Sequence, residues 1–374
     1  MLPPRALQII VGAFVAANLT ALAWTGVHIG ADTGRYTTGA AQLTAGAPLD
    51  TVQSVHIGYI VLIAIFQAAH FGLVGVVVFQ ILVAAASLVA VHGAARSLGG
   101  ATAGVLAALV LAGDIDTNRW HSFVLTDSLF LSLQAIGVWW LYRATAGGRA
   151  RGSMFGALLL FGGLALVRPE SWIVAAAAVI YATGISRPSI VWLVLAAVAV
   201  LVVATALLAP VRTALDALLP VEPLRYGRTI WGYDGWTLAM PGNADGTPDP
   251  RGVVGALRYA AHHPVSASAL MLARLAVHFA HVRPYYSIIH NAAIVCWLLL
   301  VYGFAWRGWR AVGRHPFAQW VAIVVLLDAA VVAITHADWD GRYLAHVLPL
   351  IYLLSACGAV RSFSPSSSEP ITTV

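Results

Sequence analysis

A short run near the N-terminus, Gly30-Ala31-Asp32-Thr33-Gly34-Arg35-Tyr36, combines a carboxylate with small and polar residues. It follows an apolar stretch, so the carboxylate would lie where that stretch ends. A carboxylate held there could accept a proton from a hydroxyl group and act as a general base. Asp is also a preferred N-cap residue, and Asp32 equally fits the start of a helix from Thr33. The sequence leaves both interpretations open.

Three arginines stand beside turn or aromatic residues and are candidates for binding phosphate. Arg342 lies in Asp340-Gly341-Arg342-Tyr343, Arg283 precedes Pro284-Tyr285-Tyr286, and Arg168 opens Arg168-Pro169-Glu170. A planar guanidinium can hold two phosphate oxygens through parallel hydrogen bonds. We predict that Arg342 binds phosphate, with Arg283 and Arg168 as further candidates. The alternative for Arg342 is an interfacial anchor beside Tyr343.

Further polar and aromatic residues could orient a substrate. Asp127 is either a substrate-binding carboxylate or an N-cap between Thr126 and Ser128, and Glu170 either faces a substrate or solvates a short helix end. Asp338 precedes Arg342 in the same loop, and Trp231 could stack on a sugar or pack a loop. The histidines and carboxylates do not have the spacing of a metal site. We therefore predict neither a metal nor a cofactor.

Composition identifies the elements that must position these residues. The chain has 374 residues, of which 60% are hydrophobic and 10% charged, with a mean hydropathy of +0.83. Soluble proteins carry about 25% charged residues, so the chain is expected to be a polytopic membrane protein. All basic residues are arginine, and they are scattered between apolar runs. That pattern excludes a soluble nucleic-acid-binding protein despite the net charge of +6.

A membrane-spanning helix needs about 20 apolar residues. The sequence predicts an all-α fold with about ten such helices, over 6–25, 72–95, 101–113, 127–142, 153–167, 171–184, 189–209, 288–306, 317–335 and 343–360. Residues 57–69 are a candidate re-entrant or interfacial segment. Residues 266–283 have a helical pattern with several charged side chains, so we expect them along the membrane surface.

Arginines in the short loops suggest that both termini are cytoplasmic in the plasma membrane. Fourteen of the 15 acidic residues then lie at or near the outer face, since only Glu369 is cytoplasmic. We therefore expect the chemistry on the outer face. Residues 1–360 form one transmembrane domain, whose outer loops 26–56, 114–126 and 210–287 build the site, and 361–374 form a polar cytoplasmic tail. Segment 210–265 is rich in Pro, Gly and Asp and is predicted to be a partly ordered lid.

The order of these motifs resembles the GT-C superfamily of integral-membrane glycosyltransferases, which use polyprenyl-phosphate-linked sugars. Asp32, Tyr36 and Gly46 match the family's first outer loop. Further matching pieces are Leu98-Gly99-Gly100, Leu125-Thr126-Asp127-Ser128, Gly162 to Glu170, His263-Pro264, Arg283 to Ser287, and Asp340 to Tyr343 with Pro349. The resemblance covers about residues 7–357.

The resemblance implies a sugar transfer, with inversion, from a polyprenyl-monophosphate donor to a hydroxyl of a lipid-linked or cell-envelope glycan. Asp32 would be the base, and Arg342, Arg283 and Arg168 would bind the donor phosphate. The expected acceptor- and sugar-binding residues are Asp127, Glu170, Tyr36, Trp231 and Asp338. The chain lacks the paired Asp-Glu of the protein O-mannosyltransferases and a large C-terminal soluble domain. We therefore expect a lipid or small glycolipid acceptor.

Asp328, inside an apolar run, supports a competing function. Acidic residues within a membrane usually serve function, and Asp328 could relay protons in a transporter or flippase of lipid-linked saccharides. The sequence shows neither paired inverted repeats nor matched broken helices, which such transporters often have. A polymerase of envelope polysaccharide would share the outer-face site.

Overall fold

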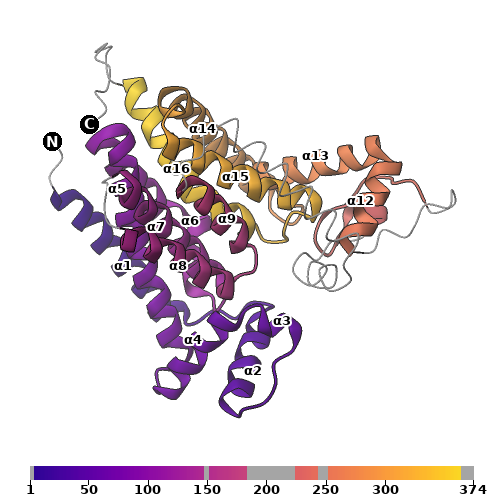
Figure 1. Cartoon of the computed structure of the whole chain (residues 1–374), viewed down its shortest axis with the longest axis horizontal. Coiled ribbons are helices and arrows are strands. Elements are labelled where there is room, and N and C mark those ends of the chain that lie inside the picture. Colours follow the sequence, from indigo (N-terminus) through magenta and orange to yellow (C-terminus); the bar gives the residue numbers. More distant parts are fainter. Residues whose placement is uncertain (1–3, 147–150, 183–223, 243–251, 364–374) are drawn as a thin grey trace.

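The computed structural model describes residues 4–146, 151–182, 224–242 and 252–363 (Figure 1). Among them, five helices are long and apolar enough to cross a membrane: Arg5–Thr25, Gly72–Gly113, Ile288–Val312, Pro316–Ile334 and Arg342–Ser362. The expected helical, multi-pass membrane architecture is confirmed, whereas the count of about ten spans is not. The span predicted over 189–209 lies outside the described residues.

The described elements are, in chain order, α1 (Pro4–Thr25), α2 (Thr33–Thr44), α3 (Thr51–Ser54), α4 (Ile57–Ala68), α5 (Gly72–Gly113), α6 (Ile115–Asn118), the 3₁₀ helix η1 (Arg119–Ser122), α7 (Thr126–Ala146), α8 (Arg151–Val167), α9 (Ser171–Ala182), the 3₁₀ helix η2 (Leu224–Tyr226), β1 (Arg228–Ile230), β2 (Tyr233–Thr237), α12 (Gly252–His262), α13 (Pro264–Ala280), α14 (Ile288–Val312), α15 (Pro316–Ile334) and α16 (Arg342–Phe363).

Helix α5 is two helical legs joined by a reversal at Gly100. Gly100 has φ +84°, a left-handed conformation that glycine adopts without steric cost. A Cβ at Gly104 would lie 2.8 Å from the carbonyl oxygen of His92, which is possible only if the second leg folds back on the first. The legs correspond to the predicted spans 72–95 and 101–113. The second leg returns the chain to the end of the bundle where α7 begins.

Helix α16 is the centre of the bundle and packs against α5, α7, α14 and α15. Its most apolar window is 83% buried within the protein, compared with 6% for α1, which lies on the outside of the bundle. Contact between α14 and α16 depends on Gly308 and Gly358. A Cβ on Gly358 would overlap the carbonyl oxygen of Phe304, and one on Gly308 would overlap that of Leu354. Small residues at such crossings let membrane helices approach closely.

The first outer loop, 26–56, contains α2 and α3 and leads into α4. These three helices lie together at one end of the bundle (Figure 1). Asp50 and Gln53 form a capping box at α3: the Gln53 amide N–H donates to Asp50 Oδ1 at 2.7 Å, and the Asp50 amide N–H donates to Gln53 Oε1 at 2.9 Å. Helix α4 packs against α2, α5 and α8. The segment predicted as re-entrant or interfacial is therefore helical, and its depth in the membrane stays a prediction.

The predicted lid contains an ordered β hairpin, which the sequence analysis did not anticipate. Strands β1 and β2 are antiparallel and are joined by the two-residue turn Trp231-Gly232, in which Gly232 has φ +66°. The Trp231 N–H donates to the Ala337 carbonyl at 2.9 Å, and the Ala337 N–H donates to the Thr229 carbonyl at 3.0 Å. The hairpin is therefore fixed to the loop before α16. Thr229, Ile230, Tyr233, Trp236 and Thr237 of the strands are β-branched or aromatic, which favours pairing over the loop that the flanking Pro, Gly and Asp indicated.

Helix α13 is amphipathic, and its Arg274 and His278 side chains are buried against its neighbours. Arg274 donates to the carbonyl oxygens of Arg228, Ala333 and Ile334 at 3.1, 3.3 and 2.8 Å. This side chain ties α13 both to the hairpin and to the end of α15. The helix expected over 266–283 is present, and its placement along the membrane surface stays a prediction.

Candidate active site

Arg342, the first residue of α16, gathers carboxylates from three other segments. Its Nη1 lies 3.2 Å from Asp32 Oδ2 and 3.7 Å from Asp127 Oδ2, and its Nε lies 2.9 Å from Asp340 Oδ1. Asp32 and Arg342 are 310 residues apart in the chain. Their side chains are 28% and 19% exposed. The two residues that the sequence analysis named as base and phosphate ligand therefore meet at a partly open position.

The loop before α16 sets the direction of Arg342. Asp338 Oδ2 accepts a hydrogen bond from the Arg342 amide N–H at 2.5 Å. Gly341 has φ +84°, and a Cβ there would overlap the ring of His281. A tight turn that only glycine fits and a carboxylate on the first amide thus fix where the helix begins. The guanidinium then lies over Trp120, 6.0 Å from its ring centroid.

Asp127 is buried beneath Arg342 and belongs to an ion-paired network. Its Oδ1 lies 2.5 Å from Arg168 Nη1 and 2.9 Å from His346 Nε2. Arg168 also donates to Thr126 Oγ1 at 3.2 Å, and its Nε lies 3.3 Å from Glu170 Oε2. The carboxylate of Asp127 therefore meets two cations and an imidazole. Such a network holds the start of α7, the turn after α8 and the start of α16 in one arrangement.

Asp32 has no capping role through its side chain. It occupies the N-cap position of α2, but its carboxylate makes no capping hydrogen bond. The neighbouring Thr33 hydroxyl accepts from the Gly30 N–H and donates to the Val124 carbonyl, both at 2.9 Å, and so ties the start of α2 to the segment before α7. The Asp32 carboxylate faces Arg342 and Arg35, each at 3.2 Å. Asp32 is therefore the N-cap residue of α2 by position but does not cap through its side chain, and its role as a base stays a prediction.

Tyr36 supports the site from behind. It is 3% exposed and packs edge-to-face against His56 and Tyr59, with ring centroids 5.3 and 5.2 Å away. Burial raises the pKa of Tyr36 to about 12, with the nearby Asp32 adding to the effect and Arg168 opposing it. A ring enclosed in this way stabilises α2 against α4. The sugar contact predicted for Tyr36 is not supported by this placement.

Arg283 lies apart from the open part of the cluster and is fully buried. Its guanidinium donates to the carbonyl oxygens of Trp339, Val282 and Val277 at 3.0, 2.9 and 3.2 Å, and its Nη2 lies 3.5 Å from Asp338 Oδ1. An arginine so occupied holds the loop before α16 in place. The phosphate-binding role predicted for Arg283 is therefore not supported.

The electrostatics of the loop differ between neighbouring carboxyl groups. Burial alone would raise the pKa of Asp338, but Arg283 and Arg342 outweigh it and hold that pKa at about 2. Asp340 has a pKa raised to about 6, because burial and the charges of Asp338 and Asp127 exceed the opposing effect of Arg342. Asp340 is therefore the carboxyl of this loop whose charge changes near neutral pH.

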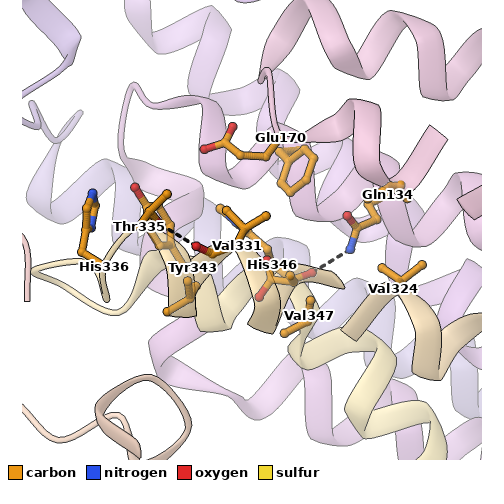
Figure 2. A pocket seen from close by; sticks show the side chains of 13 residues that line it. Gln134, Glu170, Val324, Val331, Thr335, His336, Tyr343, His346 and Val347 are labelled. Atoms are coloured by element: carbon orange, nitrogen blue, oxygen red, sulfur yellow. Dashed lines mark hydrogen bonds between the residues drawn. The ribbon is translucent and has the colours of Figure 1, made fainter. Parts of the chain in front are cut away.

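A small cavity of about 50 Å³ adjoins the network, between α7, α9, α15 and α16 (Figure 2). Its wall is mostly apolar, and its polar side chains include Glu170, His336, Tyr343 and His346. The Arg168 guanidinium lies over Tyr343, 5.5 Å from the ring centroid. Burial alone would raise the pKa of Glu170, but Arg168 outweighs it and lowers that pKa. Glu170 therefore faces the cavity as an anion.

Trp231 lies beside the cavity and not at the cluster itself. Its ring centroid is 4.7 Å from that of His336, which lines the cavity, and it is 48% exposed. The turn of the β hairpin presents it there. It is an exposed aromatic surface next to the site, as a sugar-stacking residue requires, and its predicted role remains a prediction.

His346 and Asp340 are site residues that the sequence analysis did not assign. His346 lies four residues after Arg342, one helical turn away on the same face of α16. Its neighbours in the sequence are apolar, so no local motif marks it. Two signals in the sequence indicate His346: it is a polar residue inside a predicted membrane helix, and it lies one helical turn after Arg342. Within the part of the chain that the structure describes, no three His, Cys, Asp or Glu side chains are grouped as metal ligands.

Comparison with known proteins found one family match. Residues 57–211 match the model of the dolichyl-phosphate-mannose-protein mannosyltransferases. No curated protein matches the chain. The matched segment contains Asp127, Arg168 and Glu170, whereas Asp32 and Arg342 lie outside it. Because the matching family belongs to the GT-C superfamily, the resemblance that the motifs indicated is confirmed over residues 57–211, which are less than half of the chain.

Proposed function

We propose that the protein transfers a sugar from a polyprenyl-monophosphate donor to a hydroxyl of a lipid-linked or cell-envelope glycan at the outer face of the membrane. The observation that carries this proposal is the pairing of Asp32 with Arg342 at 3.2 Å, in a partly exposed position where the last helix begins. A proton acceptor and a phosphate ligand are the two groups that such a transfer needs. The family match over 57–211 supports the choice of donor.

In the proposed reaction the acceptor hydroxyl oxygen forms a bond to the anomeric carbon, and its proton goes to the Asp32 carboxylate. The bond between that carbon and the phosphate oxygen breaks, and its electron pair stays on the phosphate. Attack opposite to the departing phosphate inverts the anomeric centre. The departing group is polyprenyl phosphate, whose growing negative charge needs fixed positive groups nearby.

Arg342 is suited to that charge because part of its guanidinium is unoccupied. Its Nε and Nη1 face carboxylates, but its Nη2 makes no hydrogen bond or ion pair with any described residue. A phosphate oxygen could accept from Nη2 without displacing Asp340. Arg168, held by Asp127 and Glu170, would contribute its charge from below.

A direct test measures donor binding and transfer by the purified full chain in liposomes. Polyprenyl-monophosphate hexoses and pentoses are offered in turn, and released polyprenyl phosphate and glycosylated lipid are measured. Arg342→Ala should weaken donor affinity about ten- to more than a hundredfold, the loss expected for one charged hydrogen-bonding group. Arg342→Lys should restore little, because an ammonium cannot reproduce the planar fork.

Arg143→Ala is the matched control, since Arg143 lies over the Trp139 ring at the other end of α7. It should leave donor affinity unchanged. An Arg342→Ala protein that binds the donor as tightly as the wild type would refute the phosphate role. Arg342 would then be an interfacial anchor.

Sidedness is tested with an impermeant thiol reagent on intact cells. Cys296 is exposed and is first replaced by Ser, whereas Cys357 is buried. Asp32→Cys should then be labelled from outside, and Arg361→Cys only after permeabilisation. The reverse pattern would place the site on the cytoplasmic face and overturn the proposed location.

The alternative of a transporter or flippase rests on Asp328. Its Oδ2 lies 3.5 Å from His278 Nε2, and it lines the cavity that His346 also lines. A transporter would move a lipid-linked saccharide without releasing polyprenyl phosphate. The liposome experiment separates the two functions. A transferase releases polyprenyl phosphate without moving the lipid-linked saccharide across the membrane, whereas a flippase moves the saccharide and releases no polyprenyl phosphate. Asp328→Asn should leave transfer intact if the proposal is right.

A further inference from the structure

Three arginines line one shallow hollow at the end of α14 and α16, far from Arg342. The hollow is lined by Arg307, Arg310 and Ala311 of α14 and by Arg361 of α16, and we call it the arginine hollow. Arg307 and Arg310 are three residues apart and therefore share one face of their helix. The crossing at Gly308 and Gly358 brings the two helices together at this end. Three positive charges from two helices are thereby concentrated around one hollow.

No carboxylate neutralises this concentration in the part of the chain that the structure describes. The ion pairs recorded there involve none of the three arginines. All three side chains are exposed. The contrast with Arg342 and Arg168, which are both ion-paired, indicates that the charges of the hollow are available to an external anion.

The length of α16 separates the hollow from Arg342 by about one hydrocarbon thickness, as expected of a site at the level of the lipid headgroups. Arg342 and Arg361 are at opposite ends of α16, about 30 Å apart at 1.5 Å per residue, which is the thickness of the hydrocarbon core. Figure 1 shows the end of α16 on the side of the bundle away from α2 and α3. Trp306, in the same turn as Arg307, is 63% exposed, as expected of an aromatic residue at the membrane interface.

We propose that the arginine hollow binds the phosphate of an anionic phospholipid headgroup in the leaflet opposite to the Asp32–Arg342 site. Guanidinium groups suit phosphate because their N–H groups match its oxygens in pairs. Basic hollows between membrane helices at this depth are suited to such headgroups. A bound lipid would join the ends of α14 and α16 through contacts that neither helix makes alone.

The test is a lipid titration of the full chain in detergent, followed by native mass spectrometry. Phosphatidylglycerol is compared with phosphatidylcholine for the wild type, for Arg307→Gln/Arg310→Gln/Arg361→Gln, and for a control triple variant. The control, Arg5→Gln/Arg96→Gln/Arg143→Gln, removes equal charge outside the hollow. The hollow variant should lose roughly a hundredfold in phosphatidylglycerol affinity, from three basic groups acting together. The control should change less than threefold.

Two results would overturn the proposal: an unchanged preference for phosphatidylglycerol in the hollow variant, or an equal loss in the control. Arg361→Gln alone changes a single exposed side chain and should lower phosphatidylglycerol affinity by a smaller factor. This variant tests the proposal if the triple variant fails to fold. A separate titration with inorganic phosphate distinguishes the source of the anion. If inorganic phosphate bound as tightly as phosphatidylglycerol, the proposal of a lipid ligand would be refuted and the hollow would be a site for free phosphate.

Discussion

Replacing Asp32 by Asn separates its proposed chemical role from any structural one. The substitution keeps the shape of the side chain and removes its charge. Asp32 makes two ion pairs, with Arg342 and Arg35, through side chains that are 28%, 19% and 41% exposed, and no capping bond. Partly exposed pairs of this kind contribute about 0–1 kcal/mol each. We therefore expect the free energy of unfolding to fall by about 2 kcal/mol or less.

The rate should fall much further. Loss of a general base costs about 10²–10⁴-fold, or roughly 2.7–5.4 kcal/mol in the activation free energy. The assay measures kcat and KM for the donor in liposomes, beside thermal unfolding of the same preparations. A loss confined to kcat identifies the base. A rise in KM alone would mean that Asp32 serves only to orient Arg342.

Asp50→Ala is the matched control, because Asp50 is an aspartate in the same outer loop that does cap a helix through its side chain. Loss of such a cap costs about 1 kcal/mol of stability, and kcat should be unchanged. If Asp32→Asn behaved like Asp50→Ala, with near-normal turnover and only a lower unfolding temperature, the assignment of the base would be refuted. Asp127 would then be the next carboxylate to test.

Three further predictions concern the framework of the site. Asp127→Ala should destabilise the protein by about 3–5 kcal/mol, because it leaves Arg168 buried without its main partner. In a double-mutant cycle measured by chemical unfolding, Asp127→Ala combined with Arg168→Met should cost less free energy of unfolding than the sum of the two single changes. Burial raises the pKa of Asp340 to about 6, above its value in the unfolded chain, so the folded protein is most stable when Asp340 is protonated. This contribution to the free energy of unfolding is present at low pH and is lost as the pH rises through 6. Relative to Asp340→Asn, the wild type should therefore lose unfolding temperature between pH 4 and pH 7, and a constant difference would contradict this. Gly358→Ala should push α14 from α16 and cost about 1–3 kcal/mol, whereas Gly303→Ala, with open space around the site of its Cβ, should have little effect on thermal unfolding.

Local sequence pointed to residues that the fold brings together, but not to which of them would be in contact. Asp32 and Arg342 were recognisable because each stands at the end of an apolar run beside small or aromatic residues. Their contact depends on how α16 packs between α5, α7 and α14, which no local pattern contains. Arg283 has a similar local setting to Arg342, yet the fold buries it among backbone carbonyl groups. Burial, a property of the whole bundle, decides between the two arginines.

The same limit applies to the secondary structure. Long apolar periodicity predicted the main helices, and Gly100 marked the reversal inside α5. The hairpin at 228–237 was not predicted, because its strands are short and the surrounding Pro, Gly and Asp residues indicate loop. Its pairing with Ala337 supplies hydrogen bonds that the isolated segment lacks. Tertiary contact therefore stabilises a structure that local preference does not.

The 310-residue separation between Asp32 and Arg342 has a consequence for biogenesis. A nascent chain that has inserted only as far as α9 already contains Asp127, Arg168 and the Asp32–Arg35 pair, but it lacks Arg342, which joins Asp32 to Asp127. The cluster is completed when α16 enters the bundle. Partly synthesised or misinserted copies would therefore be inert towards the donor. Under the proposed function, insertion of α16 would complete the assembly of the bundle and the donor site in the same step.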